Sequence, residues 1–147
     1  MTERPTETLR VSRVVPATRE RVFRAWTEPE QVKRWWTIGE GWSTQSAEID
    51  LRVGGKFALG NRAEGGQVVL ITGEFLVVEP PDRLVYTWRF PGSEPAENKV
   101  TVEFRDNGGK TEVVVVHEQA SKEMAEGAVA GWTAALRSLA SALGAET

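Results

Sequence analysis

The segment from Ser121 to Gly144 most constrains the fold, because it predicts one long amphipathic helix at the end of the chain. Ser121 can act as the N-cap, and Gly144 stands where a glycine commonly ends a helix. Apolar residues recur at helical spacing and form one continuous stripe: Ala125, Ala128, Val129, Trp132, Leu136, Leu139, Ala140 and Leu143. Such a helix gains most of its stability from burying that stripe, so another element must cover it.

The segment from Ala47 to Glu118 predicts that covering element, a β-sheet. Apolar or alternating runs are separated there by turn residues: Ile49–Arg52, Lys56–Leu59, Val68–Glu79 with a break at Gly73, a strand with Leu84, Tyr86, Trp88 and Phe90 on one face, a strand with Val100, Val102 and Phe104 on one face, and Lys110–Glu118. Asp106–Gly109 is typical of a tight hairpin turn. The last three strands therefore predict an antiparallel meander.

Before the sheet region, Leu9–Val15 alternates as a half-buried strand does, and Pro16 ends it. Thr18 is a suitable N-cap for a first short helix, and Pro29 suits the first turn of a second. The predicted fold class is α+β. A curved antiparallel sheet of about six to seven strands wraps around the long C-terminal helix, and two short helices follow the first strand.

Composition limits the chemistry open to this chain. Its 147 residues, 40% hydrophobic and 27% charged, predict a single folded domain over 1–147 with its core at about 9–143. The absence of cysteine excludes thiol chemistry, and the single histidine excludes any site that needs two imidazoles. We therefore predict no metal and no cofactor. A net charge of -3 argues against nucleic acid as a partner. No stretch suits a signal peptide or a membrane span, so we expect a cytoplasmic protein and no membrane partner.

Several spaced motifs resemble the SRPBCC (START-like) superfamily. They are the run from Val22 to Glu30 with Val32 and Arg34-Trp35-Trp36, the run from Asp50 to Phe57, the run from Gly73 to Trp88, Val116-His117-Glu118 and Gly131-Trp132. The branch they most resemble contains proteins similar to the C-terminal domain of the activator of the ninety-kilodalton heat-shock chaperone ATPase. The resemblance implies a helix-grip fold with a deep cavity between the sheet and the terminal helix. Relatives bind lipids, sterols, polyketides or plant hormones there, and some cyclise or hydrolyse what they bind.

Tryptophans are the leading candidates for a binding site, because six occur in the chain. Trp35, Trp36 and Trp42 could form a mobile rim over an apolar pocket, while Trp88 and Trp132 either line its interior or fill the core. Adjacent helical residues point about 100° apart, so we expect one of Trp35 and Trp36 to contact a cavity, a lid or a partner. We also include Phe57 and Tyr86 among the ligand-binding residues.

His117 is the one candidate for acid–base chemistry. It shares the strand face of Val113 and Val115, so it could offer a hydrogen bond or a proton inside the cavity if that face points inward. The alternative is a structural histidine bound to a backbone carbonyl or to the C-terminal helix. No nucleophile accompanies it in the sequence, so we assign no catalytic residue.

Arg52 and Glu74 lie in or beside predicted strands. A charge that faces a cavity must be paired, so an Arg52–Glu74 pair could anchor a polar ligand group. The alternative is that both lie on the solvent face. Arg89 has the opposite parity to Trp88 and is expected to face outward if Trp88 faces inward.

Three functions remain open. The leading one is binding of a small hydrophobic or aromatic ligand. The second, implied by the resemblance, is a chaperone-binding module; it ranks lower because the full activator has a large domain before this one. The third is a cyclase- or hydrolase-like enzyme that uses His117 with a carboxylate. Two runs, Val68–Ile71 and Val113–Val116, are apolar on both faces, which also predicts a weak or moderate homodimer.

Overall fold

Residues 6–37, 41–89 and 98–144, which the computed structural model describes, form seven strands and three helices; for residues 6–7 and 119–127 only the backbone is described. In chain order the elements are β1 (Thr6–Val15), α1 (Arg19–Thr27), α2 (Pro29–Trp35), β2 (Trp42–Ile49), β3 (Lys56–Ala63), β4 (Val68–Glu79), β5 (Arg83–Trp88), β6 (Asn98–Asn107), β7 (Lys110–Ser121) and α3 (Lys122–Gly144).

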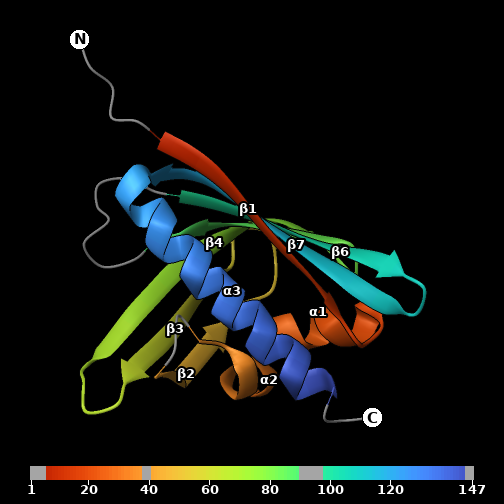
Figure 1. Ribbon diagram of the computed structural model, residues 1–147, viewed down its shortest axis with the longest axis horizontal. Helices are drawn as coiled ribbons and strands as arrows, with labels where there is room; N and C mark the ends of the chain where they lie inside the picture. The colour runs from red at the N-terminus through yellow and green to blue at the C-terminus, as the bar shows by residue number, and fades with distance from the viewer. Residues whose placement is uncertain (1–5, 38–40, 90–97, 145–147) are drawn as a thin grey trace.

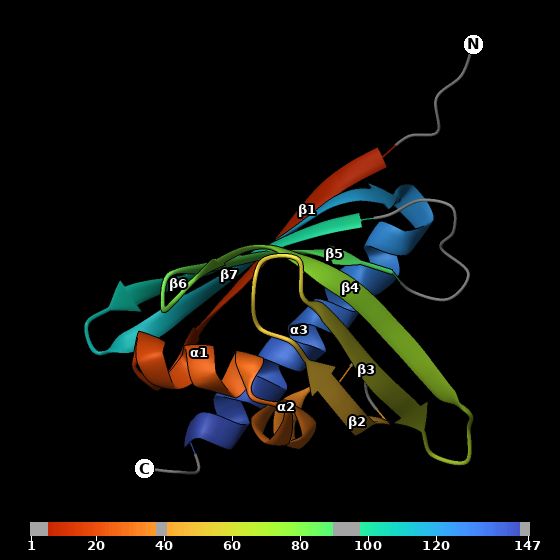
Figure 2. The same ribbon diagram turned by 180° about the vertical axis from the view of Figure 1, so that it is seen from behind.

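All seven strands belong to one antiparallel sheet with the order β1-β7-β6-β5-β4-β3-β2. The sheet curls around α3, which crosses its inner face diagonally (Figure 1). Seen from behind, α1 and α2 lie together at the C-terminal end of α3 (Figure 2). The fold class predicted from the sequence, a sheet gripping a terminal helix, is confirmed.

Local signals set both short helices. Thr18 is the N-cap of α1, and its hydroxyl oxygen accepts a hydrogen bond from the Arg21 backbone N–H at 3.4 Å. Pro29 opens α2, which ends at Trp35. Trp36 already has extended backbone, with φ -65° and ψ 132°. This early end of α2 decides where the Trp36 side chain goes.

The predicted strand at Ile49–Arg52 is wrong. The strand there is β2, Trp42–Ile49, and residues 50–55 form the connection to β3. β2 is an edge strand that pairs with β3 alone, and its register shifts between Thr44 and Ser46. A polar edge strand with such an irregularity lacks the clean alternation that marks a strand in sequence.

Gly73 does not break its strand, contrary to our expectation, because β4 runs without interruption from Val68 to Glu79. The missing side chain instead makes room. A Cβ at Gly73 would lie 2.4 Å from the Phe57 ring and 2.0 Å from the Thr87 carbonyl oxygen. The glycine therefore lets the Phe57 ring approach the backbone of β4 closely.

The core lies between the sheet and the three helices. From α3, Trp132, Leu136, Leu139 and Leu143 are buried, as the helical stripe predicted, whereas Val129 is 43% exposed. From the sheet, alternate residues of β6 and β7 are buried, including Val100, Val102, Val113 and Val115. The two-residue turn between these strands contains Gly108 and Gly109, both with positive φ, as the hairpin signal predicted.

Candidate ligand-binding site

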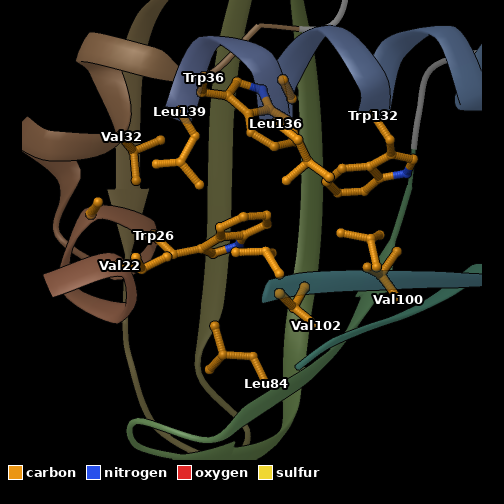
Figure 3. Packing of buried hydrophobic residues seen from close by; sticks show 14 of the residues in the cluster. Val22, Trp26, Val32, Trp36, Leu84, Val100, Val102, Trp132, Leu136 and Leu139 are labelled. Atoms are coloured by element: carbon orange, nitrogen blue, oxygen red, sulfur yellow. The ribbon is translucent and has the colours of Figure 1, made fainter. Parts of the chain in front are cut away.

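Five tryptophans form a closed ring of indoles in the core. Trp26 comes from α1, Trp35 and Trp36 from the end of α2, Trp88 from β5 and Trp132 from α3. Neighbouring ring centroids lie between 4.9 Å, for Trp26–Trp35, and 6.3 Å, for Trp26–Trp132. Figure 3 shows Trp26 and Trp132 between α3 and the strand that carries Val100 and Val102, with Trp36 drawn at the level of α3. The ring thus joins all three helices to the sheet.

Trp35 and Trp36 do not form a surface rim, and that expectation is corrected. Their exposed fractions are 2% and 5%. The Trp35 indole N–H donates to the Ala25 carbonyl at 2.7 Å. Because α2 ends at Trp35, the 100° rule for helical neighbours does not apply to the pair. Both rings reach the interior, where Trp36 packs against Trp88 and Trp132.

A small cavity of about 30 Å³ adjoins this ring. It is lined entirely by aromatic and aliphatic residues from α1, α2 and strands β2 to β5: Trp26, Val32, Trp35, Trp36, Ile49, Phe57, Leu59, Phe75, Tyr86 and Trp88. Of the ligand-binding residues predicted from sequence, Trp35, Trp36, Phe57, Tyr86 and Trp88 meet here. A cavity of this size has room for one or two waters, whereas drug-sized ligands occupy roughly 300–1,000 Å³.

Tyr86 contributes the only hydroxyl in that lining. Its ring packs against Phe57 and Phe75, at centroid distances of 5.1 Å and 5.9 Å. Burial raises the pKa of the Tyr86 phenol, and a hydrogen bond with the Trp26 side chain acts in the opposite direction. The phenol therefore stays neutral and serves as a hydrogen-bonding group rather than as a base.

His117 lies on the inner face of β7, as its parity with Val113 and Val115 predicted, and is 1% exposed. The Trp132 indole N–H donates to its Nδ1 at 3.1 Å, so the neutral imidazole carries its hydrogen on Nε2. Burial lowers the pKa of His117 to about 4. The structural alternative is thus partly right: the histidine binds the C-terminal helix through one nitrogen. Its Nε2 has no hydrogen-bond partner.

Further buried polar atoms among the described residues lack a hydrogen-bond partner. They are the Trp36 Nε1 and both side-chain polar atoms of Asn98, on β6, together with Oδ1 of Asn61, on β3. The sequence analysis overlooked both asparagines. Each nevertheless shares the parity of inward apolar residues, Asn98 with Val100 and Asn61 with Leu59. A polar residue at an inward strand position is the signal that could have identified them.

The predicted Arg52–Glu74 anchor is wrong. Arg52 is exposed and pairs with Asp50 at 2.9 Å. Glu74 is also exposed and lines a shallow groove of about 430 Å³ on the outer face of the sheet, together with Lys56 and Arg89. Both charges follow the solvent-facing alternative, because residues 50–55 form a turn and Glu74 alternates with buried Phe75. Arg89 is exposed and Trp88 buried, as their parity predicted.

Trp42, at the start of β2, is half-buried and lies outside the lining of the small cavity. No carboxylate is buried among the described side chains. The His117–carboxylate pair that an acid–base enzyme would need is therefore not formed among them. Nor does that part of the chain bring together three His, Asp or Glu side chains that could hold a metal ion.

Comparison with known proteins gives a consistent picture. Residues 16–144 match the family model described as activator of Hsp90 ATPase homolog 1-like protein. No curated protein matches the chain. A crystal structure from Chromobacterium violaceum is similar, with a TM-score of 0.83, 29% identity and coverage of 92% of this chain and 96% of that one. The solution structure of the AHSA1-like protein from Aeromonas hydrophila has a TM-score of 0.76, 26% identity and 94% coverage of each chain.

A protein from Arthrobacter aurescens, solved in solution, is similar at a TM-score of 0.83 and 25% identity, over 94% of this chain and 86% of that one. These likenesses extend over nearly the whole of each chain, so they concern the complete helix-and-sheet arrangement. Across residues 6–37, 41–89 and 98–144, no helix is long and apolar enough to cross a membrane.

Proposed function

Because the chain belongs to the family of proteins similar to the activator of Hsp90 ATPase homolog 1, whose fold is a ligand-binding one, we propose that it binds a small apolar or aromatic molecule in its interior. The site is the cavity beside the indole ring. The observation that carries this proposal is a cavity lined by seven aromatic and three aliphatic side chains. Such a wall suits flat, apolar ligands.

The cavity must enlarge to admit such a ligand. Trp36 is the side chain whose movement costs the least free energy, because it breaks no hydrogen bond. Its indole N–H has no hydrogen-bond partner, whereas the neighbouring Trp35 N–H is bound to the Ala25 carbonyl. Trp36 also stands after the end of α2, so its movement need not disturb a helix. Displacing this ring would extend the small cavity toward Trp88 and Trp132, which Trp36 contacts.

Thermal unfolding with and without ligand tests the proposal. We would screen sterols, fatty acids, flavonoids, polyketides and aromatic acids. A ligand at a hundred times its Kd stabilises the folded state by about 2.7 kcal/mol, which raises the Tm of a domain this size by about 5–10 °C. We expect one chemical class to give a saturable rise of this order.

Two substitutions test whether the ligand binds inside the protein. Ile49→Phe adds bulk to the cavity wall and should abolish the ligand-induced rise, measured against the variant's own Tm. Leu70→Phe adds a ring on the exposed outer face of the same sheet and should leave the rise unchanged. The proposal would be contradicted if no chemical class raised the Tm, or if the ligand-induced rise in Tm persisted in the Ile49→Phe variant.

The chaperone-binding module stays the second prediction. It rests on the description of the family alone, since no described surface of this chain favours it.

A further inference from the structure

We propose that His117 and Asn98 make the interior site selective for uncharged ligands that carry a hydrogen-bond acceptor, such as a ketone on an aromatic ring system, over carboxylates. This inference rests on the proposed function, because His117 and Asn98 do not line the small cavity but adjoin Trp88, which does. A ligand reaches them once Trp36 has been displaced. The selectivity follows from which buried atoms can donate hydrogen bonds, and from the charges that the interior lacks.

His117 presents a donor. Its Nδ1 is occupied as an acceptor by the Trp132 indole N–H, at 3.1 Å, so its hydrogen is on Nε2. That N–H is buried and has no partner. A buried donor without an acceptor costs free energy, which a ligand oxygen would recover. The rings of Trp88 and Trp132 lie beside the imidazole, at centroid distances of 6.1 Å and 6.4 Å. An acceptor bound here would belong to a molecule held against flat indole faces.

Asn98 presents a second donor on the neighbouring strand. It is 1% exposed, and its Nδ2 and Oδ1 both lack partners. Asn98 pairs with Trp88 on β5, and Val100, two residues further along β6, pairs with His117. Asn98 and His117 are therefore diagonal neighbours on one sheet face, a spacing that side chains of this length can bridge through a shared ligand group. Its Oδ1 can in addition accept from a ligand hydroxyl.

The surroundings disfavour an anion. No lysine or arginine is buried among the side chains that the structure describes. Lys99 and Glu118, the charged residues next to Asn98 and His117, alternate with them, point to the other face and pair with each other at 3.7 Å. The imidazole itself is held neutral, since burial lowers its pKa to about 4. A carboxylate would enter without a counter-charge, which is far less favourable than the entry of a neutral carbonyl.

Three naphthalenes of matched shape test the inference by calorimetric titration at pH 7.5. They are 2-acetylnaphthalene, with a neutral acceptor, 2-ethylnaphthalene, without one, and 2-naphthoate, which is anionic. We expect the ketone to bind about tenfold more tightly than the hydrocarbon, as one added hydrogen bond gives. The carboxylate should bind at least about a hundredfold more weakly than the ketone.

Variants identify the donors. His117→Phe should reduce the preference for the ketone over the hydrocarbon, because Asn98 alone remains as a donor, whereas His117→Gln, which keeps an N–H donor, should retain more of it. Asn98→Val provides a second, independent removal of a donor if His117→Phe fails to fold. Thr101→Val removes a polar group from the opposite face of β6 and should leave the preference unchanged. In the NMR spectrum, the single imidazole Nε2–H should shift downfield with the ketone and not with the hydrocarbon.

The outcomes separate the two proposals. Equal binding of ketone and hydrocarbon to the unmodified protein, or tightest binding of the carboxylate, would overturn the inference while interior binding stands. A ketone preference that survives both His117→Phe and Asn98→Val would also overturn it. Failure of all three compounds to bind would contradict interior binding of aromatic molecules as well.

Discussion

At the scale of single residues, the buried imidazole makes stability depend on pH. His117 is the one histidine of the chain, and burial lowers its pKa to about 4, from an ordinary value near 6.5. The unfolded chain therefore takes up a proton first as pH falls. The contribution to stability is fully present above about pH 6.5, is lost progressively toward pH 4 and is constant below that.

We expect the free energy of unfolding to fall by about 2 kcal/mol between pH 7 and pH 5 because of this residue, since one pKa unit corresponds to about 1.4 kcal/mol. Urea unfolding at the two pH values measures the change. His117→Phe should remove most of it, while carboxylate effects below pH 5 remain. An unchanged pH dependence in that variant would show that His117 does not titrate as its burial implies.

Strand parity predicted the orientation of single residues well, because a strand alternates strictly. Trp88 and His117 face inward and Arg89 faces outward, as expected. Trp35 and Trp36 both line the small cavity, so the expected cavity contact is confirmed, but the expected surface rim and divergent directions were wrong because α2 ends at Trp35. Asn98 could have been found by the same parity, but its missing hydrogen-bond partners depend on three-dimensional neighbours that no sequence spacing reveals.

At the scale of elements, β4 lies so close to its neighbours β3 and β5 at Gly73 that a methyl group has no space. A Cβ there would lie 2.0 Å from the Thr87 carbonyl oxygen, a backbone atom, and 2.4 Å from the Phe57 ring. Gly73→Ala should destabilise the protein at or above the upper end of the range of about 1–3 kcal/mol for overpacking. Denaturant unfolding gives the value.

Gly66→Ala is the matched control, because its Cβ would meet nothing closer than 3.3 Å. It should change stability by less than about 1 kcal/mol. If both substitutions changed the free energy of unfolding equally, β4 and its neighbours could separate at Gly73 at little cost. The position of Phe57 in the cavity wall would then not depend on this contact.

The elements themselves were predictable to the extent that their residues alternate or repeat. β4, β6, β7 and α3 have long, regular apolar patterns, and each was located from them. β2 was missed because a polar edge strand with a register shift gains its structure from pairing with β3 rather than from its own pattern. Tertiary pairing of this kind overrides local signals.

At the scale of the whole molecule, one of the two strands with apolar residues on both faces is covered within the chain. Val114 on β7, which points outward, is 1% exposed, whereas Val68 and Leu70 on β4 are 55% and 49% exposed. The predicted weak or moderate homodimer therefore depends on the outer face of β4. Light scattering across a concentration series should show the mass rise toward twice that of one chain.

Leu70→Lys should raise the Kd of this dimer by about tenfold or more, because it removes apolar contact area and sets like charges together. Val14→Lys, at an equally exposed position on the far strand of the sheet, should not. A single monomeric mass at every concentration would end this prediction.

Global architecture followed from the sequence because one long apolar helix and a set of strands have few ways to cover each other. The size of the interior cavity, in contrast, could not be predicted from the sequence. About 30 Å³ remains open because Trp36 turns inward after α2 ends, and that depends on the packing of five large rings rather than on any pattern.

The closed ring of indoles has an optical consequence. Its neighbouring chromophores are separated by only 4.9 to 6.3 Å, which is close enough for their electronic transitions to couple when excited. The folded protein should therefore give exciton-split bands in circular dichroism that no isolated tryptophan gives. Because the coupling depends steeply on separation and angle, displacement of a single ring would change the whole spectrum, and the chain carries its own optical reporter of how its interior is packed.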